Sequence, residues 1–321
     1  MSKPAPQHED TGRKAKPPVN VLILGETANG KSTLIRQLGV CAGNTNPDVK
    51  IGYGNVSCTK EVGRYPISAK LRNYYLEDAY SGQQIKNAKY SDLVDFTDDN
   101  ATVVGSKSDE NGKVFNFEPI DTPGLDDSDG NDMEIMTDII EKVGELSHLN
   151  AVIYVRSMNK PVGKSFTRLY EYIQRCVPVI SNGLIVVHTC FSIDRVETAL
   201  SGKYDLAKQR QEAFQTATKG RMSVAHFFMD PDPDPDMMNP FAVAESLKLL
   251  KLLSTQLPLD ITNLKLLKAP DMVNVDAHVL LTLERLQARL QNRLNEELAA
   301  ADKSKEGILR IHREISRLKA Q

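Results

Sequence analysis

The chain has 321 residues, of which 40% are hydrophobic and 26% are charged, so it is large enough to bury one large core or two smaller ones. Forty Lys and Arg residues against 42 Asp and Glu residues leave a formal net charge of −2, which excludes a general attraction to nucleic acid or to an anionic membrane. No apolar run reaches the length of about 18 residues that a membrane span requires, and we expect a cytoplasmic protein. The four cysteines lack CxxC spacing, which favours reduced thiols over a zinc site.

Residues 1–18 are polar and rich in proline, which indicates a disordered arm. From residue 19 onward, apolar runs of strand length alternate with segments of helical period. The pairs are 21–24 with 33–38, 151–155 with 165–176, 184–187 with 196–217, and 225–229 with 241–253. This alternation predicts an α/β domain over residues 19–260, with a mostly parallel sheet flanked by helices.

One apolar run has a different pattern. Residues 114–120 alternate apolar and polar side chains without a preceding helix, and we expect them to follow an antiparallel partner near residues 61–67. Between these strands, about residues 68–112 form an insertion. We interpret it either as a surface elaboration or as a partner-binding subdomain.

The last segment, residues 271–321, predicts a C-terminal α-helical extension. Its two apolar stripes, with spacings of four and three, are Val279, Leu283, Leu286 and Leu290, then Ile308, Ile311, Ile315 and Leu318. Leu294 and Leu298 shift the phase between the stripes and Gly307 interrupts it, so the segment is coiled-coil-like without being a continuous coiled coil. A helical hairpin and a helix packed on the main domain both fit this pattern.

A phosphate-binding loop follows the first predicted strand. Residues 25–32 match G-x-x-x-x-G-K-[S/T] between a strand and a helix, which is the context that the pattern requires. Gly25 and Gly30 let the backbone turn its N–H groups toward nucleotide phosphates at the positive end of a helix. The predicted nucleotide-binding residues of this segment are Gly25, Glu26, Thr27, Ala28, Asn29, Gly30, Lys31, Ser32 and Thr33.

Two side chains of this loop and one later motif carry the predicted chemistry. Lys31 would place its charge at the β and γ phosphates, and Ser32 would offer its hydroxyl to Mg²⁺. The sequence DTPG at 121–124 follows the alternating strand. There, Asp121 would hold Mg²⁺ through a coordinated water, and the Gly124 N–H would contact the γ-phosphate.

With GETANGKSTL at 25–34, SCTK at 57–60 and DTPGLDD at 121–127, the sequence resembles the immunity-associated (AIG/IAN-type), septin-like GTPases, particularly fungal proteins with that G domain. The resemblance covers about residues 19–257 outside the insertion. It implies a P-loop NTPase G domain that binds GTP or GDP with Mg²⁺ and forms a homodimer in the GTP state. It also implies that Thr59 lies in switch I and closes over Mg²⁺ and the γ-phosphate, with Ser57 as the alternative hydroxyl.

Guanine recognition is less clearly encoded. The resemblance implies a [T/N]-K-x-D motif after the strand at 184–187, where this chain reads HTCFSID at 188–194, without the lysine. Asp194 is interpreted either as the carboxylate that contacts the guanine base or as the N-cap of the following helix. These residues alone do not decide whether the site is specific for guanine or for adenine.

Together these features predict a Mg²⁺-dependent GTP-binding switch. The predicted metal ligands are Ser32, Thr59 and Asp121, and the residues predicted at the reacting phosphate are Lys31, Thr59 and Gly124. Hydrolysis should be slow, because Leu125 stands where small GTPases carry a glutamine that orients water. The alternative is a nucleotide-binding scaffold that does not hydrolyse GTP and binds partners through the insertion and the C-terminal helices. An ATP-using P-loop enzyme is a third interpretation.

Overall fold

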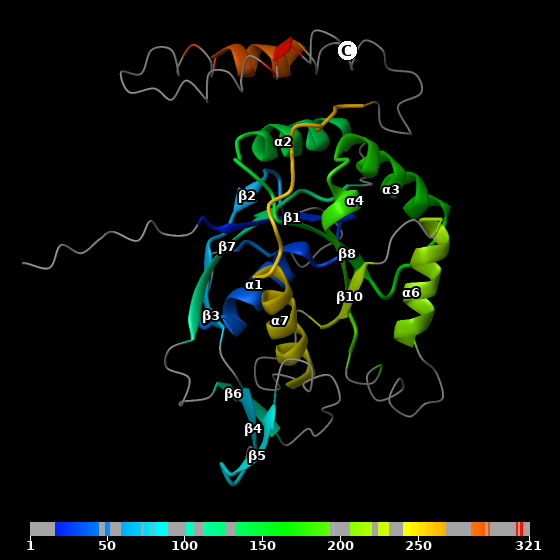
Figure 1. The fold of residues 1–321 in the computed structure, drawn as a ribbon. Helices are drawn as coiled ribbons and strands as arrows, with labels where there is room; N and C mark the ends of the chain where they lie inside the picture. The colour runs from blue at the N-terminus through cyan, green and yellow to red at the C-terminus, as the bar shows by residue number, and fades with distance from the viewer. Residues whose placement is uncertain are drawn as a thin grey trace, which may run out of the picture.

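The structure is a computed structural model of the chain. It describes residues 17–44, 49–51, 59–71, 74–78, 80–88, 101–105, 112–125, 132–192, 195, 206–219, 224–230, 240–267, 284–292, 295, 313 and 315–316. Figure 1 shows a central sheet with helices on both faces, a small second sheet at one end and a C-terminal helix at the other. Within the described ranges, no helix has the length and apolar character needed to span a membrane.

A mostly parallel sheet forms the centre of the fold. Its strand order is β10-β9-β8-β1-β7-β2, and β3 also pairs with β7. The strands paired in parallel are β1 (Val19–Leu24), β7 (Lys113–Asp121), β8 (Ala151–Ser157), β9 (Leu184–Thr189) and β10 (Ala225–Phe228). The antiparallel strands on β7 are β2 (Gly63–Arg64) and β3 (Ile67–Leu71). The predicted fold class and the antiparallel partner of residues 114–120 are therefore confirmed.

Two hydrophobic clusters cover the two faces of this sheet, because side chains alternate along each strand. In β1, Leu22 and Leu24 belong to one cluster, whereas Val21 and Ile23 belong to the other. All four side chains are buried. Burial on both faces explains why β1, β8 and β9 read as continuous apolar runs in the sequence.

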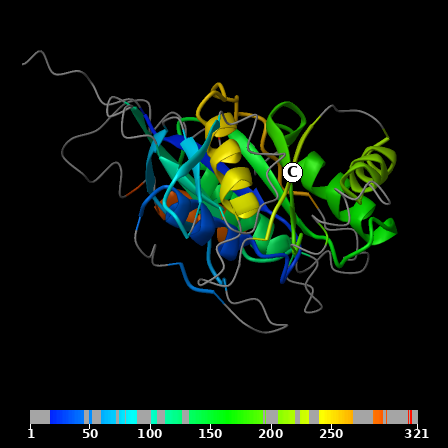
Figure 2. The same ribbon diagram turned by 90° about the horizontal axis from the view of Figure 1, so that it is seen from below.

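Helices supply the covering layers. They are α1 (Lys31–Cys41), α2 (Asp132–Gly144), α3 (Lys164–Cys176), α4 (Ile180–Gly183), α6 (Leu206–Ala217) and α7 (Pro240–Leu253). Leu34 of α1 and Leu250 of α7 join the cluster on one face, and Met136 of α2 and Ile173 of α3 join the cluster on the other. Figure 2 shows α7, in yellow, lying along the sheet. This layering places the loop between β1 and α1 at the carboxyl edge of the sheet.

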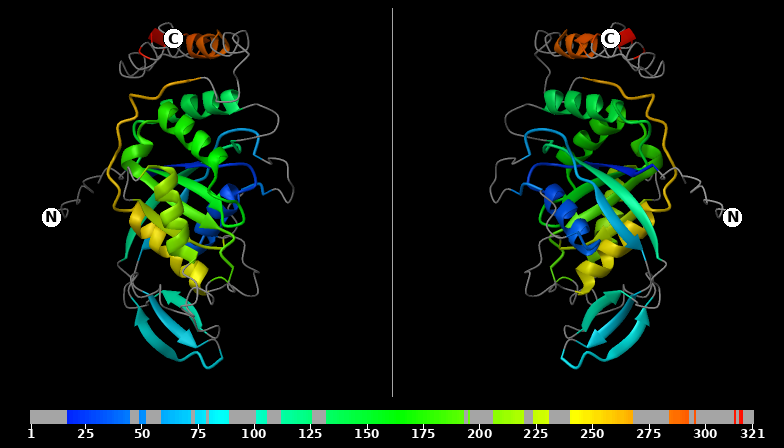
Figure 3. Two further views of the ribbon diagram at one scale, coloured as in Figure 1. Left: turned by 90° about the vertical axis from the view of Figure 1, so that its right-hand side faces the viewer. Right: turned by 90° about the vertical axis from the view of Figure 1, so that its left-hand side faces the viewer.

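The predicted insertion contains a second sheet. Its central strand β4 (Tyr74–Asp78) pairs antiparallel with β5 (Gln84–Ala88) and with β6 (Ala101–Gly105). Figure 3 shows these strands projecting from the main body in both views. The main sheet extends past the predicted start of the insertion, because β3 pairs with β7 as far as Leu71 opposite Lys113.

The C-terminal segment packs on the main domain where it is described. Residues 284–292 are helical, and Leu286 and Leu290 are 3% and 2% exposed, in the same cluster as Met136 of α2. Ion pairs to α2 join Arg289 to Asp138 at 3.0 Å and to Glu141 at 3.6 Å. These residues therefore pack on the main domain, and Ile315 of the second apolar stripe, 6% exposed, belongs to the same cluster.

Candidate nucleotide-binding site

The backbone of the phosphate-binding loop adopts conformations that favour glycine. Gly25 has φ of +150° and Gly30 has φ of +82°, and Ala28 between them has φ of +60°. A Cβ on Gly25 would also collide with the carbonyl oxygen of Val155 in β8. Both glycines of the motif are therefore required by geometry, since a side chain at either position would strain or displace the loop.

Lys31 is the first residue of α1, and its side chain crosses the loop. Its Nζ donates hydrogen bonds to the carbonyl oxygens of Gly25 and Glu26, both at 3.1 Å. Burial lowers the pKa of Lys31 to about 8, and the nearby Asp121 carboxylate opposes that shift. The ammonium group is thus held by two neutral carbonyl acceptors of the loop, which phosphate oxygens can replace.

Three oxygen-bearing side chains meet beside Lys31. The Ser32 Oγ donates to Asp121 Oδ2 at 2.6 Å, and the Thr59 Oγ1 donates to the same oxygen at 3.2 Å. The two hydroxyl oxygens lie 3.0 Å apart. Burial raises the pKa of Asp121, and the hydrogen bond from Ser32 works against this rise. These hard oxygen donors fit Mg²⁺, which prefers carboxylate, hydroxyl and phosphate oxygens.

The DTPG segment lies directly against the phosphate-binding loop. Thr27 N donates to the Leu125 carbonyl and Leu125 N donates to the Gly25 carbonyl, each at 3.2 Å, which forms a short parallel bridge. The side chain of Leu125 is fully buried in the core cluster. Thr27 Oγ1 is also buried, and among the described residues it has no hydrogen-bond partner. The DTPG segment is therefore anchored to the phosphate-binding loop at Thr27.

Residues outside the predicted set hold the loop in place. The Asn29 side-chain amide donates to the Val155 carbonyl at 3.1 Å, and Thr189 Oγ1 donates to the Asn29 carbonyl at 2.8 Å. Thr189 ends β9, two residues beyond the apolar run that marks this strand in the sequence. Sequence reasoning missed Thr189 because a threonine at a strand end has no local signature.

Lys160 was also missed. It follows β8, and its Nζ lies 3.1 Å from Glu26 Oε2 and 3.0 Å from the Thr27 carbonyl oxygen. A second cation therefore contacts the loop from outside the motif. No sequence signal links Lys160 to Glu26, because the contact depends on the neighbouring positions of β1 and β8 in the sheet.

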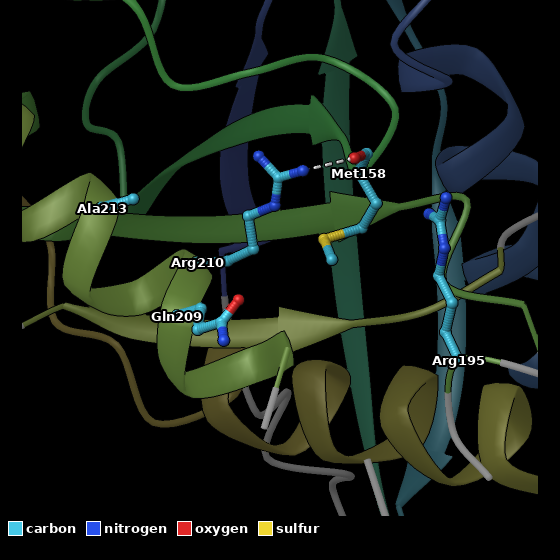
Figure 4. Close-up of a pocket in the computed structure, with 5 residues that line it drawn as sticks. All are labelled: Met158, Arg195, Gln209, Arg210 and Ala213. Atoms are coloured by element: carbon cyan, nitrogen blue, oxygen red, sulfur yellow. Dashed lines mark hydrogen bonds between the residues drawn. The ribbon is translucent and has the colours of Figure 1, made fainter. Parts of the chain in front are cut away.

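Two arginines, Arg210 and Arg195, form hydrogen bonds to the segment that carries Lys160. Arg210 of α6 donates to the carbonyls of Met158 at 2.7 Å and Lys160 at 3.1 Å. Arg195 donates to the Asn159 side chain at 2.7 Å. Figure 4 shows the two arginines on either side of Met158. The cavity between them, of about 290 Å³, is lined by Met158, Arg195, Gln209, Arg210 and Ala213.

The structure brings together most of the predicted site residues. The loop from Gly25 to Ser32, together with Thr59, Asp121 and Gly124, converges at the carboxyl edge of β1 and β7, and Thr33 lies in the first turn of α1. Asp194 and Ser57 lie outside the described residues, so recognition of the base stays a prediction.

The fold and the loop define a P-loop NTPase domain, with a glycine-rich turn between the first strand and first helix of a mostly parallel sheet. No protein-family model matches the sequence, and no curated protein matches it.

Several solved structures are similar to the chain. One is Toc33 from Arabidopsis thaliana in complex with GDP and Mg²⁺, with a TM-score of 0.44 and 12% identity over 76% of this chain and 87% of that chain. Another structure, which concerns dimerisation and GTPase activity of the chloroplast translocon components atToc33 and psToc159, has a TM-score of 0.44 and 11% identity over 75% of this chain and 85% of that chain. Elongation factor SelB from Methanococcus maripaludis, in complex with a GTP analogue, has a TM-score of 0.38 and 10% identity over 75% of this chain and 34% of that chain. These similarities are low, and the fold assignment rests on this chain's own strand order and loop.

Proposed function

We propose that the chain is a Mg²⁺-dependent GTP-binding protein that acts as a nucleotide-dependent switch or self-assembling scaffold and hydrolyses GTP slowly. The observation that carries this proposal is the cluster of Ser32, Thr59 and Asp121, whose oxygens lie 2.6–3.2 Å apart next to the lysine of the phosphate-binding loop. A loop built for phosphates and a set of hard oxygen donors in contact with it support binding of a magnesium nucleotide.

Each group has a distinct proposed role. Lys31 would exchange its two carbonyl acceptors for phosphate oxygens, which are stronger acceptors for an ammonium group. Ser32 and Thr59 would bind Mg²⁺ directly, and Asp121 would accept a hydrogen bond from a metal-bound water. A bound Mg²⁺ would neutralise charge on the β and γ phosphates. The Gly124 N–H is the candidate contact to the γ-phosphate.

Guanine is proposed as the base on the resemblance of the motifs, with Asp194 as the candidate acceptor of its N–H groups. The same resemblance supports a homodimer in the triphosphate state. The proposed G domain spans residues 19–260, and its insertion and the C-terminal segment are the proposed sites for protein partners.

One observation favours a non-hydrolysing scaffold as the second candidate function. Leu125 follows DTPG and its side chain is fully buried in the core cluster, so it neither donates to nor accepts from an attacking water. Turnover measured over a range of protein concentrations separates the two candidates. Slow turnover that rises with concentration supports a switch that self-associates, and absence of turnover at every concentration supports the scaffold.

Equilibrium binding of labelled GTP, GDP and ATP, with and without Mg²⁺, tests the nucleotide assignment. We expect the wild-type protein to bind guanine nucleotides with a Mg²⁺ requirement for the triphosphate. Lys31→Ala should weaken GTP binding at least about tenfold, because a charge-assisted contact to phosphate is lost. Lys164→Ala, which removes an exposed charge at the start of α3, is the matched control and should bind as the wild type does. Wild-type affinity in Lys31→Ala would refute the phosphate-loop assignment.

A further inference from the structure

Lys160 lies at the point where the phosphate-binding loop meets the DTPG segment. Thr27 is that point: its N–H bonds the Leu125 carbonyl at 3.2 Å, and its carbonyl accepts from Lys160 at 3.0 Å. Its hydroxyl oxygen is buried and, within the described part of the chain, makes no hydrogen bond. That hydroxyl is packed against Gly124, the residue whose N–H is the proposed contact to the terminal phosphate.

The ion pair between Lys160 and Glu26 is uneven in burial. The Glu26 side chain is 10% exposed, whereas the Lys160 side chain is 42% exposed, and the two charged atoms lie 3.1 Å apart. Glu26 is thus fixed in the loop, and Lys160 is the partner with room to move. An unpaired carboxylate in this position would repel a nucleotide phosphate.

We propose that Lys160 is the residue by which this site distinguishes a triphosphate from a diphosphate. When a triphosphate binds, the Lys160 ammonium group moves away from Glu26 and contacts the terminal phosphate; this inference rests on the proposed function. In the structure as it stands, Lys160 neutralises Glu26 and contacts the Thr27 carbonyl. A terminal phosphate beside Thr27 carries more negative charge than one carboxylate, so it attracts the ammonium group more strongly. Lys31 contacts the loop at the carbonyls of Gly25 and Glu26, whereas Lys160 contacts it at the carbonyl of Thr27.

The supporting residues make this assignment specific to Lys160. Its main-chain carbonyl is held by Arg210 at 3.1 Å, and the preceding Asn159 is held by Arg195 at 2.7 Å. The backbone of the segment is therefore anchored while the lysine side chain reaches the loop. Both arginines donate to neutral acceptors of this segment, so they position Lys160 and are not themselves placed at Thr27.

The test compares binding of GDP and of a non-hydrolysable GTP analogue, both with Mg²⁺, in full-length variants. Lys160→Ala should weaken the triphosphate at least about tenfold and the diphosphate by less than about threefold. Glu26→Gln should strengthen triphosphate binding, because Lys160 is released from its carboxylate. Lys164→Ala is the matched control for removing one positive charge, and thermal melting of each variant checks that it is folded.

The double variant Glu26→Gln with Lys160→Ala separates contact with phosphate from simple neutralisation of Glu26. If Lys160 contacts the terminal phosphate, the double variant keeps the selective loss of triphosphate affinity. If Lys160 only masks the carboxylate, the double variant regains wild-type affinity, and the proposal is overturned. Equal losses for both nucleotides in Lys160→Ala also overturn it. Failure of the wild-type protein to bind either nucleotide would instead refute the proposed function, so the two failures are distinguishable.

Discussion

Gly124 packs against Thr27 so closely that no side chain fits between the DTPG segment and the phosphate-binding loop. A Cβ built on Gly124 would overlap the Oγ1 and Cα of Thr27 and would lie 2.6 Å from its nitrogen. Two of these three contacts are with backbone atoms, which cannot rotate away. The glycine of DTPG is therefore required by packing as well as by any contact of its N–H with phosphate.

Gly124→Ala should consequently break the short parallel bridge that joins Leu125 to the phosphate-binding loop at Glu26. We expect a loss of about 1–3 kcal/mol in the free energy of unfolding, as for other overpacked sites, together with weaker triphosphate binding. Chemical denaturation and nucleotide titration measure the two effects. Gly163→Ala is the matched control, because a Cβ there meets nothing within 4 Å, and it should change stability by less than about 0.5 kcal/mol. Equal stability of the two variants would show that the contact is not tight in solution.

Ser32→Asn tests the oxygen cluster. The amide is a poor substitute for a hydroxyl on a small octahedral ion, and it also disrupts the 2.6 Å hydrogen bond to Asp121. We expect the Mg²⁺-dependent gain in GTP affinity to disappear, while GDP binding is partly kept. Titration of each nucleotide over a range of Mg²⁺ concentrations measures this. Equal losses for GTP and GDP would remove Ser32 from the metal site.

Leu290→Ala tests whether the C-terminal helix is part of the folded domain. Leu290 is 2% exposed in the cluster that contains Met136 of α2, so truncation should cost about 2–5 kcal/mol of stability. Leu257→Ala is the matched control, because Leu257 is 78% exposed. Chemical denaturation compares the two variants, and an unchanged midpoint for Leu290→Ala would contradict docking of this helix in solution.

A buried histidine pair predicts a loss of stability in mild acid. His188 Nε2 and His226 Nδ1 are 3.0 Å apart. Burial lowers the pKa of His188 to about 2, with His226 and Arg156 adding repulsion, and burial lowers the pKa of His226 to about 4. Both folded-state values lie below the unfolded value of about 6.5, so only the unfolded chain gains protons as the pH falls below 6.5.

Stability should therefore be unaffected by this pair above pH 6.5 and should fall between about pH 6.5 and 4, by about 1.4 kcal/mol per pH unit for His188. His188→Phe keeps an aromatic ring in the stack and should make this decline shallower. Denaturation midpoints at a series of pH values decide the matter, and identical slopes for wild type and His188→Phe would contradict it.

The sequence predicted the phosphate-binding loop and the DTPG segment because each depends mainly on residues that are adjacent in the chain. The turn at Gly25 and Gly30 and the following helix require only local backbone conformations. Continuous apolar runs likewise predicted the buried parallel strands, since a strand covered on both faces needs apolar side chains at every position.

The second sheet and the C-terminal helix were harder to predict for a physical reason. The strands β4, β5 and β6 contain polar and charged residues without regular alternation, so periodicity did not mark them. The stripe that includes Leu286 and Leu290 predicted an amphipathic helix, but an apolar stripe does not specify which surface covers it. Only the tertiary structure showed that this helix packs on α2.

The assembled site depends on the order of the strands. β1 lies between β7 and β8, so the carboxyl ends of these strands bring Asp121 to one side of the loop and the segment of Lys160 to the other. The sequence by itself determined that a phosphate-binding loop exists and which residues form it. The tertiary structure alone decided that Lys160 pairs with Glu26 and that Thr189 holds Asn29, because local periodicity carries no information about which strands become neighbours.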